Sequence, residues 1–319
     1  MTGSRSLRFG LVGTGYWARI THAPALASTA GIEFAAVWGR NRDAAADLAA
    51  QHGAGGYDDM SAFLSAVDAV AFAVPPDVQA AIAARAALAG KHLLLEKPVA
   101  ATEAAAGALV EAVDEAGVAS VVFFTHRFQP DVRAWLASVG ERGGWAGGVS
   151  VWLGSALQES SPFNTPWRND KGALWDLGPH VISLLWAALG PVSSVTADAG
   201  PADVTHLVLH HLGGATSTAT VTLSAPEGLP GLDLYVWGTA GTSCVPTRAI
   251  DPVAQLRTAL TELADNARSG RTDHPCDVRF GRAVGHVITD AERQIAARPR
   301  LAGQAGVATG SVSGTAPSM

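Results

Sequence analysis

The chain has 319 residues, of which 48% are hydrophobic and 16% charged, and its formal net charge is −6. This length allows two domains with separate cores, and the composition excludes a disordered protein. The negative charge argues against nonspecific nucleic-acid binding as the main role, and no apolar run approaches the roughly 20 residues of a membrane span. Two cysteines are too few for a disulfide framework and the N-terminus shows no signal-peptide pattern, so we expect a cytoplasmic α/β enzyme.

The N-terminal part, residues 1–124, alternates predicted strands and helices. Strands are expected at Leu7–Val12, Glu33–Trp38, Ala69–Val74, His92–Leu95 and Val118–Phe124. Helices are expected at Trp17–Thr29, Asp43–His52, Val78–Ala89 and Thr102–Ala116. This alternation predicts a parallel sheet covered on both faces, which is a Rossmann NAD(P)-binding domain.

The pattern changes after Phe124 and predicts a second domain over residues 125–300. Strands with alternating polarity are expected at Val149–Leu153, Val192–Ala197, Val204–Leu212, Ala215–Ser224 and Leu232–Trp237. Helices are expected at Asp131–Val139, Pro179–Leu189, Val253–Arg268 and Val278–Ala297. Glycine and proline turns between the strands favour a large, mainly antiparallel open sheet. Residues 301–319 are rich in small residues and are expected to form a disordered tail.

A glycine motif follows the first strand and reads Gly13-x-Gly15-x-x-Ala18. Glycine permits a tight turn and lets the backbone approach a pyrophosphate at a helix N-terminus. The motif lies between a strand and a helix, as the dinucleotide fingerprint requires. We therefore predict that a cofactor contacts Gly13, Thr14, Gly15, Tyr16 and Trp17.

The end of the second strand predicts which dinucleotide binds. NAD-specific proteins usually carry an acidic residue there, but this chain has Gly39-Arg40-Asn41-Arg42, and Asp43 comes only later. Arg40, with Arg42 as a second cation, is placed to meet a 2′-phosphate. We therefore favour NADP over NAD, and the alternative is that both arginines are solvated surface charges.

A lysine stands before a proline at the end of an apolar strand, in Leu95-Glu96-Lys97-Pro98. With Val74-Pro75-Pro76 upstream, this stretch resembles the Gfo/Idh/MocA oxidoreductase family, and the resemblance extends over about residues 7 to 297. It implies a Rossmann domain joined to an α/β domain with an open antiparallel sheet. Relatives often have His at the position of Gln79. We place these residues among the cofactor contacts: Val74, Pro75, Pro76, Gln79, Glu96 and Lys97.

The second signature of the family, Asp-x-Gly-x-His, is matched by Asp176-Leu177-Gly178-Pro179-His180. A spacing of four puts Asp176 and His180 on one face of a helix start. The resemblance implies that Lys97, Asp176 and His180 form the catalytic set. Taken singly, Asp176 would suit a helix cap and His180 a packed helix residue.

Each of the three groups has a chemical role in alcohol oxidation. His180 titrates near neutrality and suits a general base, or a general acid in the reverse direction. Lys97 can hold the reacting oxygen and stabilise negative charge on it. Asp176 is expected to bind a neighbouring substrate hydroxyl or to favour protonated His180.

Two further pairs complete the predicted site. Trp167 and Arg168 resemble a family element that folds over the nicotinamide, although nearby prolines also suit a surface loop. His126 and Arg127 follow the last Rossmann strand and are predicted to floor the substrate pocket, with an interdomain hinge as the alternative.

No metal is predicted, because neighbouring strand residues such as His210 and His211 face opposite sides and lack acidic or cysteine partners. An open sheet needs cover, so we expect a homodimer or homotetramer. The sequence thus predicts an NADP-preferring oxidoreductase acting on a secondary hydroxyl or carbonyl of a sugar, polyol or related cyclic compound. The alternatives are a non-catalytic NADP-binding regulator of the galactose-repressor type and an oxidoreductase for trans-dihydrodiols or other non-sugar carbonyls.

Overall fold

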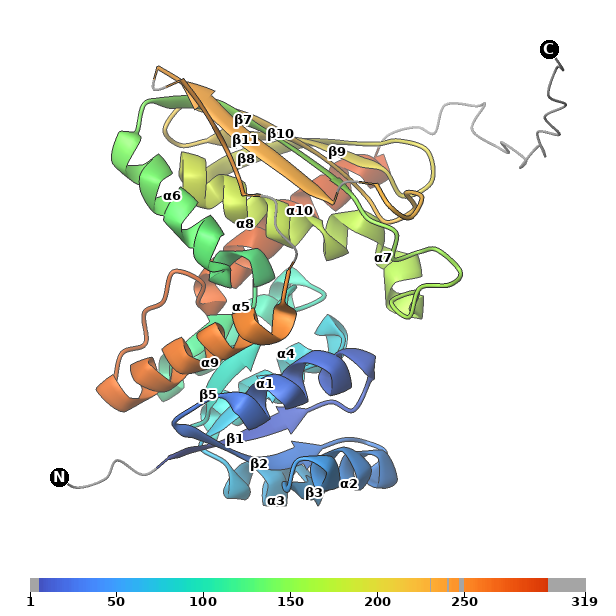
Figure 1. The fold of residues 1–319 in the computed structure, drawn as a ribbon, viewed down its shortest axis with the longest axis vertical. Helices are drawn as coiled ribbons and strands as arrows, with labels where there is room; N and C mark the ends of the chain where they lie inside the picture. The colour runs from blue at the N-terminus through green and yellow to red at the C-terminus, as the bar shows by residue number, and fades with distance from the viewer. Residues whose placement is uncertain (1–5, 230, 240, 247–249, 298–319) are drawn as a thin grey trace, which may run out of the picture.

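The computed structural model describes residues 6–229, 231–239, 241–246 and 250–297, which fold around two six-stranded sheets (Figure 1). The predicted tail at 301–319 lies outside the described residues. In Figure 1 the first sheet lies at the bottom, the second at the top, and helices fill the space between them.

The first sheet is parallel throughout and has the strand order β3-β2-β1-β4-β5-β6. Its strands are β1 (Leu7–Val12), β2 (Ile32–Trp38), β3 (Gly55–Tyr57), β4 (Ala69–Phe72), β5 (His92–Leu95) and β6 (Ser120–Val122). The order reverses between β1 and β4, and ligands of such sheets bind in the crevice at this reversal. The predicted Rossmann architecture is confirmed.

The helices of this half are α1 (Ala23–Ser28), α2 (Arg42–Gln51), α3 (Met60–Ala66), α4 (Pro76–Leu88) and α5 (Glu103–Ala116). The first predicted helix is interrupted, because Ala18–His22 forms a π turn (η1) before α1. Pro24 has no N–H, and its ring would crowd the carbonyl four residues back, so the wider turn accommodates it. Gly90, just beyond α4, has a φ of +75°, as a helix-ending glycine should.

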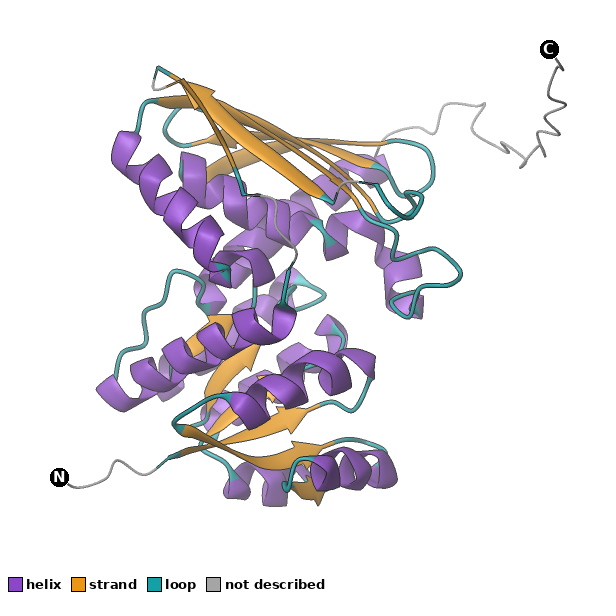
Figure 2. Cartoon of the chain, viewed as in Figure 1, coloured by secondary structure: helices purple, strands orange, loops and turns teal. Residues whose placement is uncertain are grey.

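The second sheet has the order β12-β11-β7-β10-β9-β8. Its strands are β7 (Trp145–Leu153), β8 (Val192–Ala199), β9 (Thr205–His211), β10 (Thr216–Thr222), β11 (Leu232–Gly238) and β12 (Gly241–Cys244). Only β7 and β10 pair in parallel; the other described pairs are antiparallel, which confirms the predicted sheet type. The helices α6 (Pro130–Arg142), α8 (Gly178–Leu189) and α10 (Val278–Ala297) lie on one side of this sheet (Figure 2).

Three segments hold the two halves of the chain together. The 3₁₀ turn η2 (Thr125–Phe128) leads from the first sheet into α6, and α9 (Pro252–Ser269) returns to pack on β5 and β6. Helix α10 contacts both α5 and β8. The helix α7 (Pro166–Asp176) ends directly before α8, and its last residue contacts Lys97, two residues after the end of β5.

Candidate active site

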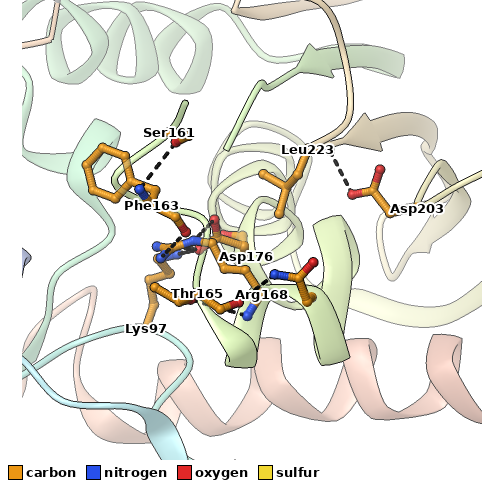
Figure 3. Close-up of polar contacts among 9 residues, drawn as sticks. Lys97, Ser161, Phe163, Thr165, Arg168, Asp176, Asp203 and Leu223 are labelled. Carbon is orange, nitrogen blue, oxygen red and sulfur yellow. Dashed lines mark hydrogen bonds and ion pairs between the residues drawn. The ribbon is translucent and has the colours of Figure 1, made fainter. Parts of the chain in front are cut away.

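Lys97 and Asp176 meet between the two halves of the molecule although they are 79 residues apart in sequence. The Lys97 Nζ donates hydrogen bonds to the Asp176 Oδ1 at 2.7 Å and to its backbone oxygen at 2.8 Å (Figure 3). The Asp176 side chain is buried and that of Lys97 nearly so, with 8% and 11% of them exposed. The residues that the two sequence signatures pair by resemblance are thus in direct contact.

Gln79, expected to contact the cofactor, instead points into the protein and is fully buried in α4. Its Nε2 donates to the backbone oxygens of Glu96, Pro98 and Val99, at 2.8, 3.2 and 3.2 Å. Its Oε1 accepts the Glu96 N–H at 2.8 Å. The side chain therefore fixes the backbone on both sides of Lys97, which an amide with a donor and an acceptor end can do.

Arg168, also expected at the cofactor, lies on the Asp176 carboxylate. Its Nε donates to Oδ2 at 2.8 Å and its Nη2 to Oδ1 at 3.3 Å (Figure 3). Burial raises the pKa of Asp176, but Lys97 and then Arg168 outweigh it and hold that pKa well below its usual range. Asp176 thus forms two ion pairs, with Lys97 and with Arg168, while its charge also favours protonation of His180 as expected. Trp167 lies against the Arg168 guanidinium at 5.9 Å.

His180 lies in an aromatic cluster with His126 and Trp152. Ring centroids are 5.9 Å apart for His126 and His180, and 5.6 Å apart for Trp152 and His180. Burial, and then the charge of Lys97, hold the pKa of His180 well below 6.5, and burial lowers that of His126 to about 4. Both rings are therefore neutral at pH 7, and a neutral imidazole is the form that accepts a proton.

Arg127 does not join this cluster. Its Nη1 donates to the Ser183 oxygen at 3.0 Å, and its guanidinium lies over the Phe280 ring at 5.6 Å. It lines a different cavity of about 410 Å³ together with Arg133 and His274. Of the two residues expected at the substrate, the structure brings only His126 to His180, and Arg127 fits the hinge alternative.

A pocket of about 520 Å³ opens where the strand order of the first sheet reverses. It is lined by Gly13, Thr14, Gly15, Trp38, Gly39, Arg40, Asn41, Ala73, Val74, Pro75 and Val78. Gly13 has a φ of +124°, and a Cβ there would lie 2.5 Å from the Ala73 oxygen, so only glycine fits. A Cβ on Gly15 would meet nothing within 4 Å, which leaves the loop backbone open to a ligand. This cradle fits a dinucleotide.

The two arginines at the end of β2 differ. Arg40 lines the pocket, whereas Arg42 does not and lies with its Nε 3.9 Å from the Asp58 Oδ2. Asn41, which the sequence did not single out, caps α2 and also lines the pocket. Of the predicted 2′-phosphate ligands, Arg40 alone faces the cradle.

Tyr16, Trp17 and Glu96 lie beyond the lining of this pocket. The Glu96 Oε1 accepts the Trp17 Nε1–H at 2.7 Å and lies 2.9 Å from the Nε2 of His22, so the carboxylate ties the glycine-motif helix to the Lys97 segment. The Phe163 ring, from the loop before α7, contacts Tyr16 at 5.4 Å and Trp17 at 5.9 Å. No sequence pattern marked Phe163, because its partners are contributed by the other half of the chain.

The histidines of β9 are bound within the sheet. His206 contacts the Thr220 hydroxyl at 3.0 Å, and His211 contacts the Gly190 oxygen and the Ser217 hydroxyl at 2.7 and 2.8 Å. Across the described part of the chain, no group of three or more His, Cys, Asp or Glu side chains is placed to hold a metal ion. Within the same residues, no helix has the length and apolar character of a membrane span.

Fold and site together define a class: two-domain Rossmann proteins with a buried lysine–aspartate pair at the domain junction. Residues 7–124 match the oxidoreductase family with an NAD-binding Rossmann fold, and residues 142–243 match the GFO/IDH/MocA C-terminal domain. The chain belongs to the GFO/IDH/MocA oxidoreductase family.

Individual relatives agree with this assignment. An uncharacterized oxidoreductase, ORF334 of Rhizobium meliloti, is 30% identical over 67% of this chain and 68% of its own length. Levoglucosan dehydrogenase of Pseudarthrobacter phenanthrenivorans is 34% identical over 41% of this chain, and the match spans only 35% of that enzyme. The crystal structure of GenD2 from gentamicin A biosynthesis, in complex with NAD, aligns with this chain with a TM-score of 0.80 at 22% identity. The alignment covers 93% of this chain and 97% of the GenD2 chain, which shows a shared fold.

Proposed function

We propose that the protein is an NADP-preferring oxidoreductase that transfers hydride between a nicotinamide and a secondary hydroxyl or carbonyl of a sugar, polyol or related cyclic compound. One observation carries the proposal: the buried Lys97 ammonium is held by Asp176 and lies close to the neutral His180, at the end of a strand of the dinucleotide-binding sheet. The name of the levoglucosan dehydrogenase, a relative that acts on an anhydrosugar, supports this substrate class.

The nicotinamide, when bound, would accept or supply the hydride, and the chain's own groups would handle the proton and the charge on oxygen. Lys97 donates two hydrogen bonds to Asp176, and an ammonium has three N–H groups, so one is left for a substrate oxygen. That donor stabilises negative charge developing on the oxygen. Neutral His180 can take the hydroxyl proton in oxidation and return it in reduction.

The NADP preference rests on Arg40. It lines the cofactor pocket at the end of β2, where an acidic residue would bind the 2′-hydroxyl of NAD. A guanidinium can instead form paired hydrogen bonds with a 2′-phosphate. GenD2 was solved with NAD, so NAD is the competing cofactor to test.

The main alternative is a non-catalytic regulator of the galactose-repressor type. A regulator needs the cofactor pocket, but it has no need of a buried lysine beside a neutral histidine. Burying charged groups costs free energy unless they are paired, and such groups concentrate at catalytic sites. The cluster at Lys97, Asp176 and His180 therefore favours the enzyme.

The test is an oxidation panel of sugars, anhydrosugars, polyols and trans-dihydrodiols with both cofactors, read by absorbance of the reduced nicotinamide. We expect turnover of a sugar or polyol, faster with NADP than with NAD. Lys97→Met should lower kcat by about 10²-fold or more while cofactor binding persists. Lys171→Met, in a partly exposed ion pair with Glu292, is the matched control and should leave kcat unchanged. Cofactor binding without turnover anywhere in the panel would favour the regulator, and turnover confined to dihydrodiols would favour the non-sugar alternative.

We further propose that a second copy of the chain covers the outer face of the second sheet. One row across this face, in register from β11 to β8, consists of Tyr235, Val149, Thr218, Val208 and Thr196. None of these is charged, and Figure 1 shows helices only on the opposite face. The next row of the same face carries Asp233 and Asp198 at its two ends and Val151, Thr220 and His206 between them, so its charges lie toward the edges of the sheet. A sheet face with an uncharged middle suits an interface between subunits.

A further inference from the structure

The Asp176 carboxylate binds two cations, and the proposed chemistry uses only one of them. Lys97 reaches it from the end of β5, and Arg168 reaches it from the first turns of α7. Arg168 touches neither the pocket at Gly13 nor the ring of His180 in any described contact. Its contact with Asp176 is one that the expected cofactor role does not require.

The Arg168 side chain is held from several directions. Its Nη1 donates to the Phe163 oxygen at 3.3 Å, and its guanidinium lies 5.4 Å from the Phe163 ring and 5.9 Å from the Trp167 ring. The Thr165 hydroxyl caps the helix and accepts the Arg168 N–H at 3.4 Å (Figure 3). A guanidinium held in this way is preorganised to form its fork on one carboxylate.

The backbone of α7 brings the arginine to the aspartate eight residues later. Gly172 lies between them with φ +63° and ψ −165°, so the helix is kinked there. The kink turns the first part of α7 back toward its own end. Arg168 and Asp176 therefore meet within one short segment, and this segment also faces Lys97.

The charges at the site do not cancel. Lys97 and Arg168 carry two positive charges and Asp176 one negative charge, which leaves an excess of one positive charge. The titratable or charged groups that act on His180 are Lys97 after β5, Asp176 and Arg168 in α7, and His126 in η2. Lys97, His126 and Arg168 oppose its protonation, and Asp176 favours it.

We propose that Arg168 is a positioning residue that keeps Asp176 ionised and fixed beneath Lys97, so that one positive charge remains in excess beside the reacting oxygen. The proposal rests on the proposed function. The excess charge stabilises an oxygen that is losing its proton and keeps His180 in the form that accepts that proton. Arg168 acts through Asp176 and Lys97 and does not touch the substrate.

Three variants test the proposal in the full chain. Arg168→Gln removes the positive charge, and Arg168→Lys keeps the charge but not the paired guanidinium hydrogen bonds to Asp176. Lys171→Gln removes a charge from the same helix that is paired with Glu292 and not with Asp176. In Arg168→Gln we expect kcat to fall about 10- to 100-fold, with cofactor affinity within about two-fold. Because His180 loses a cation that opposes its protonation, the acid limb of kcat/KM should move to higher pH, by about half a unit or more. Arg168→Lys should keep the acid limb near its original pH, and Lys171→Gln should change nothing.

A second measurement is independent of turnover. The His180 ring protons are titrated by NMR in the wild-type protein and in Arg168→Gln, without substrate, with circular dichroism to verify the fold. A higher His180 pKa in the variant supports the proposal even if the substrate panel is silent. An unchanged His180 titration and an unchanged acid limb overturn it, whatever happens to kcat, because a merely structural arginine would lower activity without moving either.

Discussion

The burial of the His126 imidazole should make the free energy of unfolding depend on pH. Its pKa is about 4 in the folded protein, against about 6.5 in an unfolded chain. Above pH 6.5 both states are neutral, but below it the unfolded chain takes up a proton that folded His126 does not. The free energy of unfolding should therefore fall by about 2 kcal/mol between pH 7 and pH 5 on account of this residue.

His126→Phe removes this titration and keeps an aromatic ring against Trp152. Urea unfolding at pH 7 and pH 5 should show that the variant loses about 2 kcal/mol less than the wild type over that interval. His286→Phe, at a 56% exposed position beside Glu103 and Asp290, serves as the control for replacing a histidine by phenylalanine. Equal pH dependence in all three proteins would show that His126 takes up its proton at the same pH in the folded and the unfolded chain.

Arg40 and Arg42 form a natural pair for testing the cofactor preference. They are two residues apart, but only Arg40 lines the pocket, and the Arg42 side chain is 81% exposed. Arg40→Gln should weaken NADPH binding by about 10- to 100-fold, since a hydrogen bond to a charged group contributes about 1.5–3 kcal/mol, and should change NADH binding little. Arg42→Gln should bind both cofactors as the wild type does. Fluorescence titrations at one fixed salt concentration would measure this, and tighter binding of NADH by the wild type would reject the NADP assignment.

At the scale of elements, hydrophobic pattern predicted the long or strongly apolar segments well. The bounds of β1 and β5 agree residue for residue with the prediction. The strand β3 was not predicted, because Gly55-Gly56-Tyr57 is too short and too rich in glycine to show alternating polarity. The helix α7 was not predicted, because the prolines in and before it favoured a loop. Pro166 is nevertheless the first helical residue, where its missing N–H costs nothing.

Only those site residues that lie within local sequence motifs could be predicted from the sequence. Lys97, Asp176 and His180 each follow from a local signature, but the roles of Gln79 and Arg168 depend on distances between segments. Gln79 bonds to backbone 17 to 20 residues away, and no spacing rule connects a helix residue to the turn after the next strand. The resemblance therefore pointed to residues that the fold brings together, whereas the contacts by which Gln79 and Arg168 support them are visible only in the fold.

Gly172 forms the kink in α7 that brings Arg168 to Asp176. Its backbone, at φ +63° and ψ −165°, is one that only glycine adopts readily, whereas a Cβ would meet Asp203 at an ordinary 3.5 Å. Gly172→Ala should therefore destabilise the protein by about 1–3 kcal/mol through backbone strain and loosen the contact of Arg168 with Asp176. Gly285→Ala is the matched control, because Gly285 lies within α10 with nothing within 4 Å of the added Cβ. That change should stabilise by about 0.5–1 kcal/mol, and urea unfolding that gave both variants the same sign would contradict the assignment of strain.

At the scale of the whole molecule, the contact between Lys97 and Asp176 depends on two halves of the chain keeping one relative position. The helices α9 and α10 supply this, since α9 packs on the first sheet and α10 contacts elements of both halves. All described helices of the second half lie on the inner side of its sheet, so the outer face is available to a partner (Figure 2). A subunit bound there would stiffen the sheet that carries Trp152 without covering the cofactor pocket.

A charge placed in the middle of that face tests the proposed self-association. Val151 and Tyr235 are 36% and 41% exposed on β7 and β11. A symmetric interface would bury the added charges of both copies together in low dielectric, so Val151→Lys combined with Tyr235→Lys should dissociate the assembly to single chains. Leu88→Lys, at a 57% exposed position on α4, adds a charge elsewhere and should leave the assembly intact. Light scattering coupled to gel filtration should give the wild type and Leu88→Lys two or four chain masses, and the double variant one. A wild type that runs as a single chain at every concentration, or a double variant that keeps the wild-type mass, would show that this face is not the interface.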